Sequence, residues 1–294
     1  MKFTFNKQFM VLKFLLLKCF AKQITLKLTE AGTLPNKIGI GEKILVTNLK
    51  IIGEINGTDL RFIREMAGSD VKGNSTSGNL SVLDLSEAKF VAGGDYYYKD
   101  YEDGCYTSND IIGKYAFRDC KSLTSVIIPS SVTEIREYAF DGCISLKNVN
   151  IPSSVTEIGC GAFGGCSSLT SVNIPSSVTS IGKYAFFYCS GLKSIYVYAE
   201  TVPSIGAGAF NGFDSENCTL YVPKGTYDVC RYSWGYYFEN IVEFDATNIR
   251  NIVAEPEVQE NARYAVNGQR LTAPVKGINL VKYNNGRVKK EIVK

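Results

Sequence analysis

The stretch that decides the fold is residues 112–132, which read IGKYAFRDCKSLTSVIIPSSV. Residues 135–155 repeat it as IREYAFDGCISLKNVNIPSSV, and two further copies follow. A constant stride of 23 residues separates the four cysteines of these copies, Cys120, Cys143, Cys166 and Cys189. Because one copy is too short to bury its own apolar side chains, the copies must stack on one another into a solenoid.

Each copy predicts one short strand that ends at a proline. Leu123, Val126 and Ile128 alternate with polar residues near the end of the segment, as expected of a strand with one buried face. Pro129 follows at once, and because proline has no N–H group it ends the ladder and turns the chain out of the sheet. Stacked copies therefore predict a parallel sheet on one face of the solenoid.

The opposite face is predicted to consist of short helical turns. An Ala-Phe pair precedes each cysteine, and Val132 and Ile135 lie three residues apart, as on one side of a helix. The fold class expected is thus an α/β solenoid whose inward residues form columns, with Leu123, Leu146, Leu169 and Leu192 in one column.

The pattern continues less regularly on both sides of the four copies. Residues 220–223 keep the strand and the proline, while residues 46–51 and 80–85 share an L-x-x-L-x-L-like arrangement. The repeat resembles that of the BspA-like family of bacterial surface leucine-rich-repeat proteins, which have the same Ala-Phe-x-x-Cys core and Ile-Pro-x-Ser-Val turn. The resemblance implies a leucine-rich-repeat solenoid in a secreted or surface-exposed adhesive or recognition protein, with no catalytic residues.

Composition excludes several functions. The 294 residues contain no histidine, which removes Ser-His-Asp and Cys-His catalysis and histidine-ligated metal sites. The net charge is +3, and no basic run is interleaved with aromatic residues, so we expect no nucleic-acid partner. An enzyme without histidine would need paired carboxylates, as in glycoside hydrolases, but Glu134 and Glu157 become Ser180 in the next copy and form no such constellation. We expect neither a cofactor nor a metal.

The regularly spaced cysteines are interpreted as buried free thiols in one column. Parallel side chains on stacked coils do not favour the close Cβ approach of a disulfide. A structural zinc site would need ligands that converge on one point, commonly from C-x-x-C pairs, and the sequence has none.

The sequence divides into five segments. Residues 1–22 have the order of an export signal, although Lys13 and Lys18 interrupt the apolar part, so an altered start is the alternative. Residues 23–79 are expected to cap the amino-terminal end, with a helix over 56–66 capped by Thr58. Residues 80–244 form the solenoid and its carboxy-terminal cap, 245–260 a linker, and 261–294 a small β-hairpin module that sorts or anchors the protein. No segment is apolar enough over its length for a membrane-spanning helix.

Residues 95–106 form an acidic, tyrosine-rich insertion that the sequence predicts as a solvated loop. Loops often carry function, and Asp100, Glu102 and Asp103 offer oxygen ligands for calcium, although their spacing does not match the helix-loop-helix calcium pattern.

The outward side of the predicted sheet is the expected binding surface. It changes from small polar residues to tyrosines along the chain, and tyrosine combines a flat apolar ring with a hydrogen-bonding tip. The candidate residues are Asn148, Asn150, Ser171, Asn173, Lys193, Ser194, Tyr196, Tyr198 and Tyr221. The alternative is that these rings only cover apolar surface at the solenoid end.

The function expected is noncatalytic recognition or adhesion at the cell surface or in secreted form. The partner would be an extracellular protein or glycan, such as a host or matrix component, bound by a monomer. A structural spacer without its own ligand site is the alternative, and a glycoside hydrolase is a weaker one.

Overall fold

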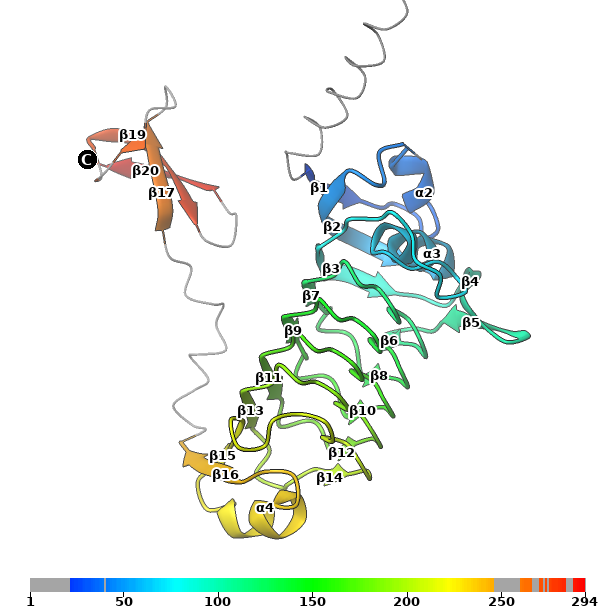
Figure 1. Ribbon diagram of the computed structural model, residues 1–294. Coiled ribbons are helices and arrows are strands. Elements are labelled where there is room, and N and C mark those ends of the chain that lie inside the picture. Colours follow the sequence, from blue (N-terminus) through cyan, green and yellow to red (C-terminus); the bar gives the residue numbers. More distant parts are fainter. Residues whose placement is uncertain are drawn as a thin grey trace, which may run out of the picture. The chain divides into compact units, whose positions relative to one another are not determined.

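Figure 1 shows the computed structural model of the protein, which describes residues 22–39, 41–245, 260–265, 270–271, 273, 275–283 and 288–293. The chain divides into two compact units, Met1–Phe244 and Asp245–Lys294. The predicted export signal, apart from Lys22, and most of the predicted linker lie outside the described residues. Among the helices of the described part, none has both the length and the apolar character of a membrane span.

The first unit is a solenoid of stacked parallel coils, as predicted (Figure 1). One strand from each coil enters the main sheet, and every neighbouring pair is parallel. The pairing is interrupted once, so the strands form two ladders in the orders β1-β2-β3-β7-β9 and β11-β13-β15-β16. Their bounds are β1 Lys22–Lys27, β2 Val46–Ile55, β3 Val82–Phe90, β7 Ser125–Ile127, β9 Asn148–Asn150, β11 Ser171–Ile174, β13 Ser194–Val197, β15 Thr219–Pro223 and β16 Asn240–Phe244.

A second, narrow parallel sheet runs along another side of the coils. Each coil contributes two residues to it, and from Glu134 onward these follow a proline turn. In the order β14-β12-β10-β8-β6 these strands are Ser204–Ile205, Ser180–Ile181, Glu157–Ile158, Glu134–Ile135 and Ile111–Ile112.

The predicted helical turns are wrong, because the described residues between the narrow sheet and the next main strand form turns rather than helices. Two positions four residues apart in each coil have a left-handed backbone, for example Tyr138 at φ 55° and Gly142 at φ 72°, and such residues interrupt a right-handed helix. The backbone N–H groups of these turns then point alternately towards the next coil and back into their own coil. That of Phe140 donates to Ala162 O in the next coil at 2.7 Å, whereas that of Ala139 donates to Arg136 O in its own coil.

The interior is built from columns, as predicted. Leu123, Leu146, Leu169 and Leu192 are all buried, with at most 2% of the residue exposed. Phenylalanine rings stack with centroids 5.0–5.2 Å apart and planes within 12° of parallel; they belong to Phe117, Phe140, Phe163, Phe186 and Phe210.

The cysteine column consists of free, buried thiols, as interpreted from the sequence. The thiols of the second to fourth coils also donate a hydrogen bond to the phenylalanine carbonyl of the preceding coil, with Sγ···O distances of 3.0 Å from Cys143, 3.3 Å from Cys166 and 3.1 Å from Cys189. Burial raises the pKa of Cys120 to about 11 and that of Cys189 to about 12.

The amino-terminal part packs two helices against the first strands. They are α2 (Leu34–Lys37) and α3 (Gly57–Met66), and α3 buries Leu60, Ile63 and Met66. The N-cap of α3 is Asn56 rather than the predicted Thr58. The Asn56 side chain accepts from the Thr58 N–H at 3.0 Å, and Asp59 accepts from the Asn56 N–H, which completes a capping box.

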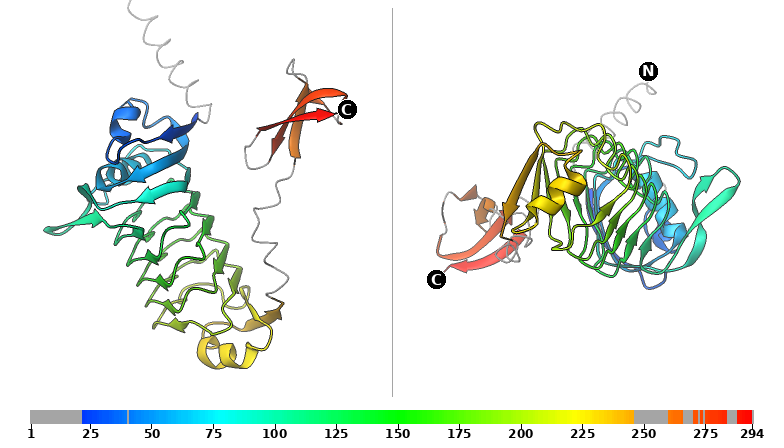
Figure 2. Two further views of the ribbon diagram at one scale, coloured as in Figure 1. Left: turned by 180° about the vertical axis from the view of Figure 1, so that it is seen from behind. Right: turned by 90° about the horizontal axis from the view of Figure 1, so that it is seen from below.

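The insertion at 95–106 is a β-hairpin, not the predicted loop. Strands β4 (Gly93–Asp100) and β5 (Asp103–Thr107) pair antiparallel and project from the coils (Figure 2). Tyrosine favours strands, and Tyr97 and Tyr98 hold the hairpin in place because both are buried.

Backbone hydrogen bonds join the turns of successive coils into a ladder, the turn ladder. At its amino-terminal edge, the turn carbonyls of the first coil accept hydrogen bonds from side chains. In later coils the corresponding carbonyls of Glu137, Ala139 and Asp141 accept from the N–H groups of the coil before. In the first coil, Arg64 donates to Ala116 O and Arg118 O, both at 3.1 Å, and the Tyr97 hydroxyl donates to Lys114 O at 2.9 Å. Two side chains thus replace the missing coil.

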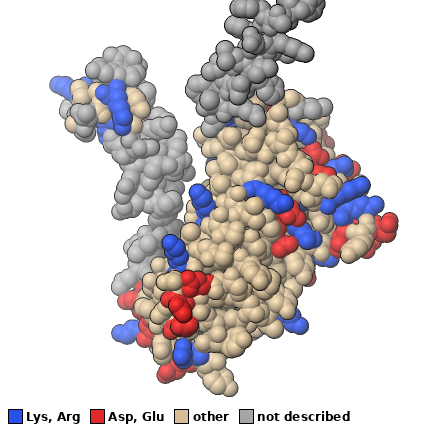
Figure 3. Space-filling model, in the orientation of Figure 1, with Lys and Arg blue, Asp and Glu red and all other residues tan. Residues whose placement is uncertain are grey.

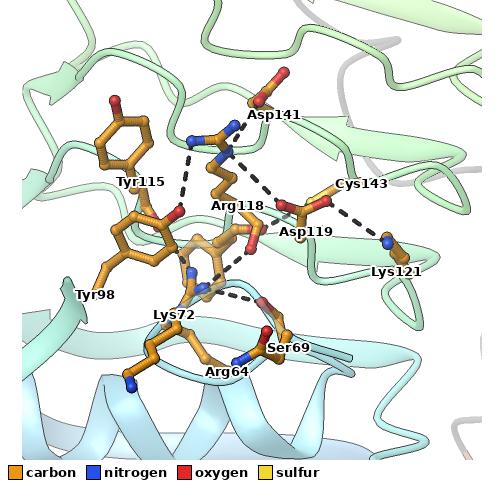
Figure 4. Close-up of polar contacts among 12 residues, drawn as sticks. Arg64, Ser69, Lys72, Tyr98, Tyr115, Arg118, Asp119, Lys121, Asp141 and Cys143 are labelled. Carbon is orange, nitrogen blue, oxygen red and sulfur yellow. Dashed lines mark hydrogen bonds and ion pairs between the residues drawn. The ribbon is translucent and has the colours of Figure 1, made fainter. Parts of the chain in front are cut away.

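The residues around this junction form a polar network (Figure 4). Arg64 is fully buried and lies over the Tyr98 ring, 4.9 Å from its centroid. Arg118 approaches Asp141 at 3.2 Å and Asp119 at 3.7 Å, so α3 and the first two coils are joined through cations.

The carboxy-terminal end of the solenoid is covered by α4 (Tyr227–Trp234) and the residues after it. Trp234 and Phe238 are buried against Phe210, but Tyr232 and Tyr236 are 95% and 89% exposed, so only some of the aromatic residues in this segment cover the core. The Tyr237 hydroxyl accepts from the Gly208 N–H at 2.8 Å, on the edge of the ladder opposite Tyr97.

The second unit contains a four-stranded antiparallel sheet in the order β18-β17-β19-β20. The strands are β17 Glu260–Ala265, β18 Arg270–Leu271, β19 Gly277–Tyr283 and β20 Val288–Val293. Both turns predicted from Asn-Gly sequences lie outside the described residues.

We expect Tyr97→Phe to lower the free energy of unfolding by about 1–3 kcal/mol, because it leaves the Lys114 carbonyl without its donor. Urea unfolding of the full chain, followed by the fluorescence of Trp234, the single tryptophan, measures it. Tyr106→Phe is the matched control, since Tyr106 is 57% exposed. Equal losses in both variants would contradict the role of the Tyr97 hydroxyl.

We also expect the solenoid to lose stability as the pH rises above 9.0, the ordinary pKa of a thiol. The unfolded chain releases the thiol proton there, whereas folded Cys120 keeps its proton to about pH 11, so unfolding becomes easier as the pH rises between these values. Urea unfolding under reducing conditions at pH 8 and pH 10 should show a loss that is about 1 kcal/mol smaller in Cys120→Ala than in the unchanged chain. Identical losses would show that Cys120 does not contribute.

Candidate binding face

The outward side chains of the main sheet form two columns along the repeats. Alternation places Val149 and Val172 in the core and turns the residues on either side of each outward. The register pairs Ser171 with Ser194 and Asn173 with Tyr196. The first column is Ser125, Asn148, Ser171, Ser194 and Thr219, and the second is Ile127, Asn150, Asn173, Tyr196 and Tyr221.

The chemistry of this face changes along the sheet. At its amino-terminal end, the Lys50 ammonium on β2 forms ion pairs with Glu87 at 2.6 Å and Asp84 at 3.5 Å, and the hydrogen bond that Lys50 donates to Glu87 raises the pKa of Lys50. The strands β7 to β11 then present hydroxyls, amides and Ile127, with no outward charge in their two columns. Residues 144–199 carry four charged side chains in all. In the view of Figure 3, charged residues likewise gather near the two ends of the first unit.

Aromatic rings occupy the carboxy-terminal end of the face. The rings of Tyr196 and Tyr221 stack with centroids 4.4 Å apart and planes 7° from parallel. Phe244, at the end of β16, meets Tyr198 edge to face at 5.5 Å and Tyr196 at 6.2 Å. All four rings are half-buried, so they pack on one another while keeping exposed surface.

Tyr198 stands where the preceding coils have proline. Pro152 and Pro175 hold the corresponding positions, and a proline has no N–H to donate. The Tyr198 N–H instead donates to Ile174 O at 3.0 Å, which fixes the backbone beneath the ring. Burial raises the pKa of Tyr198 and of Tyr196, so both hydroxyls stay protonated and able to donate at neutral pH.

The structure places all nine predicted residues on or beside this face. Asn148, Asn150 and Lys193 are exposed, and the other six are half-buried. Lys193 precedes β13 and lies at the edge of the columns. The Ser194 hydroxyl donates to that of Ser171 at 3.0 Å, whereas the amides of Asn148, Asn150 and Asn173 have no hydrogen-bond partner among the described residues. Unbonded amides of this kind are available to a ligand.

Sequence reasoning missed two groups of aromatic residues. Phe244 is the last residue of the segment predicted as solenoid and carboxy-terminal cap, and its place two residues after the outward Val242 puts it on the same face as Tyr221. Tyr184 and Tyr188, which are 46% and 59% exposed, flank Phe187 on the turn side of the coils. The tyrosines were hidden in the repeat motif, where Tyr115 and Tyr138 are less exposed.

The carboxylates that the sequence offered for glycoside hydrolysis or calcium binding lie outside these two columns. Glu134 and Glu157 lie side by side in the narrow sheet, and Glu134 pairs with Arg136 at 3.0 Å. In the hairpin, Asp100 forms an ion pair with Lys114 at 2.9 Å. The described residues contain no cluster of three or more acidic or cysteine side chains placed to hold a metal.

Comparison with known proteins identifies the repeats. Residues 110–240 match the BspA type leucine rich repeat region, in six copies. No curated protein matches the chain.

Several solved structures are similar to parts of the chain. A leucine rich repeat protein of T. pallidum is 31% identical, over 45% of this chain and 61% of that one, with a TM-score of 0.34. A leucine rich cell surface protein of Faecalibacterium prausnitzii A2-165 is 26% identical, over 55% and 37%, with a TM-score of 0.31. A leucine-rich repeat protein of Bacteroides ovatus ATCC 8483 is 22% identical, over 69% and 49%, with a TM-score of 0.41. The chain spans less than two thirds of each of these structures.

Proposed function

Because residues 110–240 are a leucine-rich-repeat region of the BspA type, we propose that the protein is a noncatalytic recognition or adhesion protein, secreted or held at the cell surface. Its main sheet binds an extracellular macromolecule, a host or matrix protein or a glycan. The observation that carries the proposal is the outward face of β9 to β15, where amides without partners adjoin a cluster of half-buried tyrosines. Binding faces combine such aromatic anchors with a polar surround.

The rest of the chain supports this face in the same proposal. Residues 23–79 cap the amino-terminal end, supported by the hydrogen bonds of Arg64 to the first coil. The stretch 261–294 is a separate β module that sorts or anchors the protein, supported by its own antiparallel sheet. The protein acts as a monomer.

We expect the triple variant Tyr196→Ala, Tyr198→Ala, Tyr221→Ala to lose binding at least ten-fold, or about 1.4 kcal/mol, because it removes the aromatic anchors of the face. The measurement is binding of the full chain to arrays of immobilised extracellular matrix proteins and glycans, with affinities then determined for each hit. Urea unfolding checks that the variant still folds cooperatively.

The matched control is Tyr184→Ala with Tyr188→Ala, which removes exposed tyrosines from the turn side and should leave binding unchanged. Equal binding by the triple variant and the unchanged chain would refute the site. An unchanged chain that binds nothing on either array would favour the structural spacer.

A further inference from the structure

The neighbours of the Tyr196 ring differ on its two sides. Tyr221 covers the opposite face of that ring at 4.4 Å, whereas the neighbour in register on the β11 side is Asn173. The asparagine side chain ends well short of a tyrosine ring, so the outer part of the Tyr196 face rises above it as a step. Tyr196 is half-buried, which agrees with one covered and one partly open face.

The floor before this step is polar but uncharged. The outward columns of β7, β9 and β11 consist of Ser125, Ile127, Asn148, Asn150, Ser171 and Asn173. The nearest outward charge in these columns is Asp84 on β3, which already pairs with Lys50. Lys147 and Lys193 are exposed at the edge of the columns and not within them. A charged ligand lying along the columns would therefore find no counter-charge beneath it and would lose part of its hydration, so the floor suits a neutral one.

The floor also repeats. Asn150 and Asn173 are 23 residues apart and belong to successive coils, whose Phe140 and Phe163 rings stack 5.2 Å apart, so the two amides follow each other at about the rise of one coil. Each amide offers both donors and an acceptor. A polymer of hydroxylated rings offers the same two functions at regular intervals, whereas a folded protein surface is irregular and carries charges at its rim.

We propose that this surface, the Asn–Tyr step formed by Asn150, Asn173 and Tyr196, binds a neutral chain of pyranose sugars. One sugar ring stacks on the open face of Tyr196, and hydroxyls of the adjacent sugars bond the amides of Asn173 and Asn150. The inference rests on the proposed function and narrows its ligand to an uncharged glycan.

The test uses the full chain and four neutral probes, cellohexaose, xylohexaose, mannohexaose and maltohexaose, with binding measured by titration calorimetry. At least one probe should bind, and Tyr196→Ala should weaken it at least ten-fold because the stacking ring is lost. Tyr196→Phe keeps the ring and should stay within about three-fold, since hydroxyl removal costs one hydrogen bond at most. Asn173→Leu keeps the side-chain size, removes the amide and should weaken binding about five- to ten-fold.

Controls separate this inference from the broader function. Tyr188→Ala should bind as the unchanged chain does, and raising the salt concentration from 0.05 M to 0.5 M should have little effect on a neutral ligand. Binding that Tyr196→Ala leaves intact, or binding that falls steeply with salt, would overturn the Asn–Tyr step. If no hexasaccharide binds but the tyrosine triple variant loses a protein ligand on the arrays, this inference fails while the proposed function stands.

Discussion

Stacking of the coils in register is the constraint on which the rest of the structure depends. Each pair of parallel phenylalanine rings contributes about 0.5–1.5 kcal/mol beyond the burial of its apolar area. The next cysteine thiol bonds the carbonyl of a phenylalanine in the coil before, so a ring and a thiol both fix the same register. An extra residue inside the motif would move every later side chain out of its column. The step from Phe186 to Phe210 is 24 residues rather than 23, yet the rings still stack at 5.2 Å, because the irregular segment between β13 and β14 absorbs the difference.

A stack held by hydrogen bonds between coils must end somewhere, and its two ends need opposite chemistry. The first coil presents carbonyls that lack donors, and a late coil presents N–H groups that need acceptors. Arg64 and the Tyr97 hydroxyl donate at one end, and the Tyr237 hydroxyl accepts at the other. A hydroxyl can take either role, whereas a guanidinium only donates, so Arg64 suits the carbonyl end alone. Satisfying these buried groups avoids a cost of about 1–3 kcal/mol for each one left without a partner.

The strands, the prolines and the columns were predictable because a period of two and a stride of 23 residues are both visible in the sequence. The left-handed turns were not, since tyrosine is an unusual residue at positive φ. A signal was nevertheless present. The position of Tyr138 and Tyr184 is glycine in other coils, at Gly161 and Gly208, and an alternation of tyrosine with glycine indicates a position that favours positive φ. A Cβ atom on Gly161 would lie 2.5 Å from the Tyr138 ring, and one on Gly208 would lie 2.5 Å from the Tyr184 ring. Each tyrosine ring therefore packs against a glycine of the next coil, where a larger residue would clash.

The columns of the candidate face could be predicted, whereas the packing of its rings could not. Contacts of Tyr196 and Tyr198 with Phe244 join residues of different coils whose strands pair only through β15, and no local pattern shows that arrangement. Its consequence is rigidity. Tyr221 and Phe244 restrict the Tyr196 ring, while the Tyr198 N–H is bonded to Ile174 O where a proline would have left that acceptor empty. Side chains that are already ordered lose little conformational entropy when a ligand binds, typically saving about 0.5–1.5 kcal/mol each. Inward residues cannot vary without breaking the columns, so the departures from the repeat at Tyr196, Tyr198 and Tyr221 lie where the solenoid is free to acquire a binding role.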